Sequence, residues 1–401
     1  MKRTIRLVSS LGAFALALSA CTSSSTPSAP NVNQQPNSNT VSYTSAASIG
    51  IPTLSKSLGN PPGTLPTSGG FDISWIGDGN YYLADRDSNG IDVINISSRK
   101  FVMTAGQGSF AGVNTTNGNA AGPNGIFNVG PNLVMAGDGN STIKVVNTST
   151  GSVVYSSPVI TNMTSQAGKP VGWTCTQGPY LRADEGAWDS TDGIAIMVND
   201  ADCPPFATFY NTNSSSYPIL GQLSFVGANG GAEQATWDPA TDLFYISFPG
   251  TVANPNGELD VIDPKTRSIV AAYPEPANCQ GNGTALGPNE ELFIGCSNAA
   301  SGNLVIMNPT NGSTVAVVPG AAGCDEVYYN KGDNRFYAAC SNNKTGNLGP
   351  IVAVVNAAAP FNLIATIPTN AGSHSIASDS GTNTTWVPLT GTTGVSVYTH
   401  N

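Results

Sequence analysis

Charged residues are scarce in this chain. Lysine and arginine together number 15, aspartate and glutamate number 25, and the formal net charge is −10 over 401 residues. Proteins that bind nucleic acid neutralise phosphates with clustered basic side chains. Beyond the first six residues the sequence has no basic run and no groove-like mixture of aromatic and arginine residues. We therefore expect no nucleic-acid partner.

Histidine and the common catalytic motifs are also lacking. His374 and His400 are the two histidines of the chain, too few for a histidine-rich copper or di-metal site. The sequence contains no G-x-S-x-G elbow, no H-E-x-x-H motif and no phosphate-binding loop. The chain has many serines, and no sequence motif identifies one of them as a nucleophile. We therefore assign no catalytic residues.

The one long apolar run lies at the N-terminus. A basic stretch (residues 2–6) precedes an apolar stretch (residues 7–18), which is short for a membrane span and has the form of a signal peptide. It ends in Leu18-Ser19-Ala20-Cys21, which resembles the bacterial lipobox. The resemblance implies a lipoprotein signal peptide over residues 1–20 and a lipidated Cys21 that carries acyl chains such as palmitate.

A polar segment follows the lipobox. Residues 21–45 consist largely of Ser, Thr, Pro, Asn and Gln, which is the composition of a disordered tether. Thr22 after the cysteine resembles the outer-membrane pattern, so the implied location is the bacterial cell envelope, at the outer membrane or the cell surface. Two or more acyl chains suffice for stable anchoring, and residues 46–401 would form a single domain held at the membrane.

The rest of the chain repeats a short phrase, in which an apolar run ends in Asn or Asp and then turns. The copies are Ile91–Asn95, Ile143–Asn147, Ala207–Asn211, Leu259–Asp263, Leu304–Asn308, Ile351–Asn356 and the truncated Val395–Tyr398. An Asn or Asp side chain at this place bonds nearby backbone in an Asx-turn and starts a hairpin. We interpret it as structural.

Each copy belongs to a longer unit of four short strands. A bulky residue closes the first strand, and the anchors are Trp75, Phe127, Trp188, Trp237, Leu286 and Tyr329, with Ser378 as a weak last member. Four antiparallel strands repeated at roughly 40–50 residues are typical of propeller blades. The sequence predicts an all-β, seven-bladed β-propeller of four-stranded antiparallel blades, which we expect to be a monomer. The anchor tryptophans are expected to pack between blades.

The last unit lacks a fourth strand after Tyr398. A closed ring leaves no free strand edges. A segment before Phe71, near Ile49-Gly50-Ile51, is therefore predicted to close the ring as an N-terminal strand of the last blade.

The repeats resemble those of the YVTN and NHL propeller families. Tyr82–Asp85 followed by Gly90–Asn95, and Leu259–Thr266, carry the resemblance, which extends over nearly all of residues 71–401. It implies a propeller and says little about function, because one scaffold hosts enzymes and binders alike. Asp85–Gly90 also matches the opening of a calcium loop, but Ile96 stands where that loop needs Glu, so we interpret it as a turn.

Six cysteines follow Cys21, and an even number in an exported domain indicates disulfide bonds. In three units one cysteine precedes the first strand and another follows the second strand. Antiparallel neighbours bring those positions together. The predicted bonds are Cys175–Cys203, Cys279–Cys296 and Cys324–Cys340, and the chief rival is an interblade bond between Cys296 and Cys324.

One polar group per unit is expected at the central channel. The residues three or four before each anchor should begin the innermost strand. They are Asp72, Asn124, Asp184, Glu185, Glu233 (with Gln234 beside it), Asn282, Asp325, Glu326 and His374. Carboxylate and amide oxygens suit a hard cation such as Ca²⁺. The alternative is that channel mouths are wet and polar without any ligand.

Two functions follow from these observations. The first is a lipid-anchored binding or scaffold module at the cell surface or in the periplasm, with a protein or glycan partner. The second rests on Pro123–Ile126 and Asp184–Gly186, which resemble phrases of gluconolactonase and paraoxonase propellers. That resemblance implies a calcium-dependent lactonase, esterase or lyase-like enzyme, in which the metal polarises a carbonyl and a carboxylate or His374 moves the proton.

Overall fold

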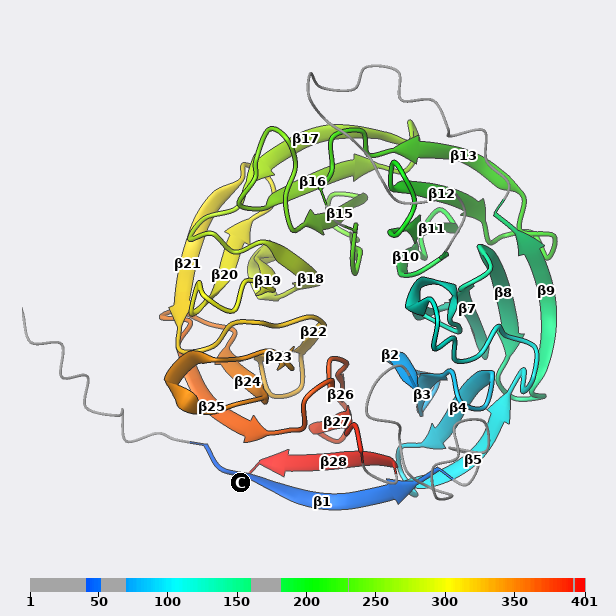
Figure 1. The fold of residues 1–401 in the computed structure, drawn as a ribbon, viewed down its shortest axis with the longest axis horizontal. Helices are drawn as coiled ribbons and strands as arrows, with labels where there is room; N and C mark the ends of the chain where they lie inside the picture. The colour runs from blue at the N-terminus through cyan, green and yellow to red at the C-terminus, as the bar shows by residue number, and fades with distance from the viewer. Residues whose placement is uncertain (1–40, 52–69, 160–181, 230, 392–393, 401) are drawn as a thin grey trace, which may run out of the picture. The chain divides into compact units, whose positions relative to one another are not determined.

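The computed structural model describes residues 41–51, 70–159, 182–229, 231–391 and 394–400. Its strands form seven four-stranded antiparallel sheets arranged in a ring (Figure 1). The predicted seven-bladed β-propeller is confirmed. Within the described ranges, helix is confined to the short 3-10 turns Gly118–Ala120, Pro288–Glu290 and Thr345–Asn347. No helix there is long and apolar enough to cross a membrane.

Six of the seven blades run from an innermost to an outermost strand in chain order. The first comprises β2 (Phe71–Gly77), β3 (Asn80–Asp85), β4 (Gly90–Asn95) and β5 (Lys100–Ala105). The second comprises β6 (Ile126–Gly130), β7 (Leu133–Asp138), β8 (Thr142–Asn147) and β9 (Ser152–Pro158). The third comprises β10 (Gly186–Asp189), β11 (Ile194–Asn199), β12 (Phe206–Asn211) and β13 (Ile219–Ser224). The fourth comprises β14 (Thr236–Asp238), β15 (Leu243–Phe248), β16 (Glu258–Asp263) and β17 (Ser268–Pro274).

The remaining blades follow the same plan. The fifth comprises β18 (Gly281–Leu286), β19 (Leu292–Cys296), β20 (Asn303–Asn308) and β21 (Ser313–Pro319). The sixth comprises β22 (Val327–Asn330), β23 (Arg335–Cys340), β24 (Ile351–Asn356) and β25 (Leu363–Pro368). The seventh comprises β26 (Ala377–Asp379), β27 (Thr384–Pro388), β28 (Gly394–His400) and, as its outer strand, β1 (Tyr43–Gly50).

The burial of a strand follows its place in the blade. Middle strands are covered on both faces, so β3 is apolar and buried from Tyr81 onward. A short continuous apolar run is the sequence signature of such a strand. Outer strands have one wet face, and the residues of β9 alternate between exposed and half-buried. The core lies between blades: Tyr82 of the first blade clusters with Val134 of the second.

The Asn or Asp that ends the third strand forms an Asx-turn in the first five blades, as predicted. The side-chain Oδ1 of Asn147 accepts hydrogen bonds from the backbone N–H groups of Ser149 and Thr150, both at 3.0 Å. The β3–β4 loop is also a turn, because Asp85 Oδ1 accepts the N–H groups of Asp87 (2.9 Å) and Ser88 (3.1 Å).

The N-terminal strand closes the ring, also as predicted. β1 pairs antiparallel with β28 along the outer edge of the last blade, with Ile49 opposite Val395 (Figure 1). The strand starts at Tyr43, three residues ahead of the domain boundary expected at 46. Ile49 is buried in a cluster that includes Trp386, so apolar packing holds the closing strand in addition to backbone hydrogen bonds.

Two of the predicted disulfide bonds are present. Cys279 bonds Cys296 in the fifth blade, and Cys324 bonds Cys340 in the sixth. The rival bond between Cys296 and Cys324 is excluded because both sulfurs are used. Cys175, a partner in the third predicted bond, lies outside the described residues. Each observed bond ties the segment before an innermost strand to the end of the next strand.

Truncating the closing strand's buried side chain should weaken the whole fold. We expect Ile49→Ala to lower the free energy of unfolding by about 2–4 kcal/mol, through lost burial and the cavity left behind. Chemical denaturation with a tryptophan fluorescence readout measures this. Ser48→Ala, on the exposed face of the same strand, should change stability by less than about 0.5 kcal/mol. Equal effects of the two variants would show that β1 is not held by its buried face.

Candidate functional site

Residues in or just before the start of the innermost strands gather around a cavity at one face of the ring. Its volume is ≈340 Å³. Six of the predicted channel residues line it: Asp72, Glu185, Glu233, Asn282, Asp325 and His374. We call this cavity the polar mouth. The other three predicted residues, Asn124, Asp184 and Glu326, are buried rather than lining it.

Two arginines that the sequence analysis missed also line the polar mouth. Arg86 forms an ion pair with Asp72, and its Nη2 donates to Asn124 Oδ1 at 2.7 Å. Arg86 reaches the channel from the β3–β4 turn, because an antiparallel second strand ends at the face where the first strand begins. The loops that follow the second strands are therefore further segments of the sequence in which channel residues can be found.

Arg182 precedes β10 and neutralises a pair of buried acids. It forms an ion pair with Asp184, and its Nη2 lies 3.2 Å from Oδ2 of Asp200. Asp200 stands in the β11–β12 loop, the equivalent of the loop that carries Arg86. Arg182 is thus held by two carboxylates, and Arg86 by the Asp72 carboxylate and the Asn124 amide, so each guanidinium group is fixed by partners at the polar mouth.

Asp72 and His374 form a charged pair between the first and last blades. His374 Nε2 lies 3.1 Å from Asp72 Oδ1, and Nδ1 lies 2.7 Å from the carbonyl oxygen of Gly372. Burial opposes ionisation of Asp72, but Arg86 and the bond to His374 outweigh it and lower its pKa to about 2. Burial likewise opposes protonation of His374, yet the hydrogen bond and charge of Asp72 raise its pKa to about 9. His374 is therefore a cation at neutral pH.

Several carboxyl groups in and beside the polar mouth resist ionisation. Burial, then the charge of Glu326, raises the pKa of Glu185 well above its ordinary value. Burial, then Asp325, does the same for Glu233 and Glu326. Glu326 belongs to the sixth blade and Glu185 to the third, so their carboxyl groups repel each other across the channel, and protonation of one relieves this repulsion. The site has more carboxyl groups than cationic side chains, and protons or a bound cation must balance the excess.

Three of these carboxyl groups fit a hard metal ion. One oxygen each from Asp184, Glu185 and Glu233 lies within 4.8 Å of the others. Oδ1 of Asp184 is buried and has no hydrogen-bond partner in the described part of the chain. Anionic oxygen donors suit Ca²⁺. A second cluster of Asp189, Asp192 and Asp242 already contacts the Lys265 ammonium, at 2.9 Å from Asp192 and 2.6 Å from Asp242.

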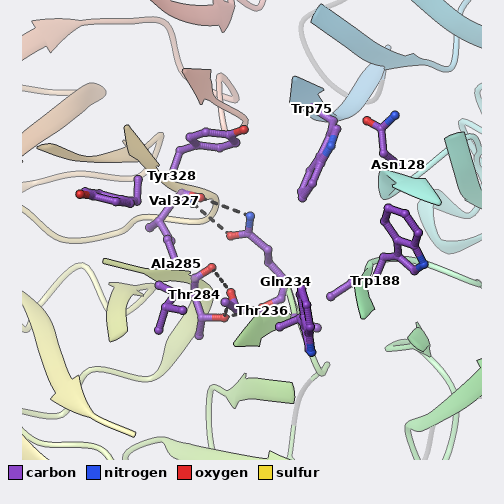
Figure 2. Close-up of a pocket in the computed structure, with 14 residues that line it drawn as sticks. Trp75, Asn128, Trp188, Gln234, Thr236, Thr284, Ala285, Val327 and Tyr328 are labelled. Atoms are coloured by element: carbon purple, nitrogen blue, oxygen red, sulfur yellow. Dashed lines mark hydrogen bonds between the residues drawn. The ribbon is translucent and has the colours of Figure 1, made fainter. Parts of the chain in front are cut away.

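Later residues of the same innermost strands line a second cavity, also of ≈340 Å³ (Figure 2). Its aromatic side chains are Trp75, Trp188, Trp237, Tyr328 and Tyr329. We call it the aromatic pocket. The tryptophans were expected to pack between blades. They do so, but they also line this pocket. Trp75 and Trp188 do pack against the core between blades, but each stays partly exposed and lines the pocket.

Two consecutive residues of the fourth blade line different cavities. Glu233 lines the polar mouth, whereas Gln234 lines the aromatic pocket. Gln234 Nε2 donates to the carbonyl oxygen of Val327 at 3.2 Å, and its Oε1 accepts the Val327 N–H at 3.3 Å. The amide thereby joins the fourth blade to the sixth, as the dashed lines in Figure 2 show.

The protonation state of His374 limits the chemistry of the polar mouth. Both ring nitrogens are engaged, and the raised pKa keeps the imidazole protonated at pH 7. His374 can donate a proton or attract an anion, but it is not a general base at that pH. The sequence predicted that His374 could move a proton in either direction, and at neutral pH only proton donation is compatible with its charged state.

No protein-family model and no curated protein matches this sequence. Solved structures do match its fold. A chain in the crystal structure of the mitotic checkpoint complex has a TM-score of 0.57 at 10% identity, covering 97% of this chain and 98% of its own. The structure of U3-55K has a TM-score of 0.58 at 9% identity, covering 82% and 95%. The RRP9 WD40 repeats have a TM-score of 0.59 at 8% identity, covering 83% and 94%.

At 8–10% identity these matches show a shared β-propeller fold alone. The likeness of the repeats to the YVTN and NHL families, and of two phrases to gluconolactonase and paraoxonase, stays a prediction.

The Asp72–His374 pair predicts an unusual titration. His374 should titrate near pH 9 by NMR of its imidazole, and Asp72→Asn should lower the midpoint, because the hydrogen bond and charge that oppose the effect of burial most strongly are then lost. The His374 contribution to stability is complete below pH 6.5 and is lost as pH rises through about 9. The Asp72 contribution is complete above 3.8 and is lost as pH falls through about 2.

With two histidines in the chain, His374→Gln identifies the signal. Asp379→Asn, a carboxyl outside the polar mouth, is the matched control and should leave the midpoint unchanged. An unshifted wild-type midpoint near 6.5 would contradict the pairing.

Proposed function

We propose that this chain is an exported, lipid-anchored β-propeller that acts as a binding or scaffold module in the bacterial cell envelope. The observation that carries the proposal is the channel, whose two cavities are lined by side chains from several blades. Blades that pack on both neighbours hold such side chains in place, and a rigid framework with preformed cavities is what a binding module needs.

The N-terminal sequence supports anchoring. The lipobox-like Leu18-Ser19-Ala20-Cys21 is followed by a polar stretch up to Tyr43, where β1 begins. A flexible chain of roughly twenty residues spans about 25 Å on average. β1 is an outermost strand, so a tether would reach the ring at its rim and leave the channel free for a partner.

The kind of partner is suggested by the fold and the charge. A propeller of the same fold is a chain of the mitotic checkpoint complex, an assembly of proteins. The net charge of −10 disfavours nucleic acid. We therefore propose a protein or a glycan as the partner and a monomeric propeller as the binding unit.

Lipidation of Cys21 is directly testable. In a diderm bacterial host fed labelled palmitate, we expect the full chain to take up label and to sediment with membranes. Cys21→Ser should abolish both, because the thiol that receives the lipid is gone. Ser24→Ala, three residues into the tether, should change neither. A wild-type chain that stays unlabelled and leaves the membrane fraction would overturn the anchor.

A calcium-dependent lactonase or esterase is the second candidate. The cluster of Asp184, Glu185 and Glu233 favours it, since these residues would hold the ion at the polar mouth. Bound calcium polarises a lactone or ester carbonyl. Beside it, His374 keeps a proton at neutral pH and Arg86 and Arg182 offer positive charge to an anionic oxygen.

Calcium binding should raise the melting temperature of the wild-type chain. An ion present at one hundred times its Kd stabilises a fold by about 2.7 kcal/mol. Glu185→Gln combined with Glu233→Gln should remove most of the calcium-dependent shift, because two anionic ligands are lost. Glu290→Gln, an exposed acid, is the control and should keep the shift. A melting temperature indifferent to calcium in all variants would rule out the metal and this candidate with it.

A further inference from the structure

The aromatic pocket has features of a ligand site that the polar mouth lacks. All of its lining side chains are neutral, and they comprise the five aromatic residues, small apolar residues, and the polar residues Asn128, Gln234, Thr236 and Thr284. The rings come from the first, third, fourth and sixth blades. Figure 2 shows Trp75 and Trp188 on one side of the cavity and Tyr328 on the other.

The rings are held in place before any ligand arrives. Trp188 Nε1 donates to Thr212 Oγ1 at 2.9 Å, and the Tyr329 hydroxyl donates to Asn334 Oδ1 at 3.0 Å. Trp75 and Tyr328 meet edge to face, with ring centroids 6.4 Å apart. A ligand that stacks on these rings therefore loses little affinity to side-chain ordering.

Hydrogen-bonding groups lie between the rings. Thr236 Oγ1 donates to the carbonyl oxygen of Thr284 at 2.7 Å, and Thr284 Oγ1 donates to that of Gln234 at 2.9 Å. The two hydroxyl oxygens also lie 2.9 Å apart, so one can accept from the other, and lone pairs remain on both for further bonds. Gln234 uses one N–H on Val327 and has a second N–H to offer. The pocket thus combines spare acceptors and a spare donor with apolar ring faces.

We propose that the aromatic pocket binds a neutral pyranose unit of a glycan. Such a ring has faces of C–H groups, which the negative faces of indole and phenol rings attract. Its rim carries hydroxyl groups that both donate and accept, which matches Thr236, Thr284 and Gln234. This inference rests on the proposed binding function and gives it a ligand class.

Two other ligand classes fit less well. A quaternary ammonium is drawn to aromatic faces, but it has no hydrogen-bonding group for the threonine hydroxyls and Gln234. A flat aromatic compound would stack and leave the same groups unmatched. The cavity of ≈340 Å³ lies at the lower end of the range for small-molecule sites, which suits one or two sugar rings.

The test follows tryptophan fluorescence of the purified full chain during titration. The probes are maltose, cellobiose and N,N′-diacetylchitobiose, with tetramethylammonium and indole as representatives of the other classes. We expect at least one disaccharide to give a saturable change. Trp188→Ala should weaken that binding at least tenfold, and Thr236→Val, which keeps the side-chain shape, should weaken it severalfold.

The control is Tyr273→Ala, which removes an aromatic ring from β17 outside the pocket and should leave the affinity unchanged. If Trp188→Ala fails to fold, Trp188→Phe and Thr236→Val still decide the question. Saturation by tetramethylammonium or indole but by no disaccharide would overturn the ligand class. Binding by no probe, or disaccharide binding that both pocket variants retain, would overturn the site. Palmitate labelling and membrane attachment of the same chain test the proposed lipid-anchored function separately. Failure of the glycan site can therefore be distinguished from failure of the anchor.

Discussion

The antiparallel pairing of β1 with β28 is the contact on which the rest of the structure depends. It joins the two ends of the described chain and completes the seventh blade. Only a closed ring brings seven innermost strands to one axis, and both cavities consist of side chains from several of these strands. Ile49 and Trp386 sit in one apolar cluster, so burial as well as hydrogen bonding keeps the ring shut.

The channel is divided into two chemical environments. Residues in or just before the start of the innermost strands supply carboxyl groups and His374, and the loops after the second strands add Arg86 and Asp200. A few residues further along, the same strands supply tryptophans and tyrosines. The charged end keeps its acids buried by protonation and ion pairing. The aromatic end is neutral, so a ligand there need not lose the hydration of a charge.

Much of the fold could be read from periodicity, because each blade obeys the same strand and turn rules. The Asx-turn after Asn147, the bond between Cys279 and Cys296 and the closing strand at Ile49 all follow from aligning the units. The candidate site was predicted less completely. The alignment of the units predicted Asp72 and His374 as channel residues, and these two do pair. Arg86 was not predicted, because it lies in the Asp85–Gly90 turn, whose sequence resembles a calcium loop and gives no sign that the turn reaches the channel.

The sequence by itself determined what is local: strand lengths, turn residues, the number of blades, the order of strands within each, and the cysteines that lie on neighbouring strands. Only the tertiary structure decided which side chains meet across the axis. The charge of Glu326 in the sixth blade acts on Glu185 in the third, and Gln234 in the fourth blade hydrogen-bonds Val327 in the sixth. The physical reason is that strand pattern and turn chemistry act over a few residues, whereas the protonation of His374 and the exposure of Trp75 depend on groups that ring closure brings from distant parts of the chain.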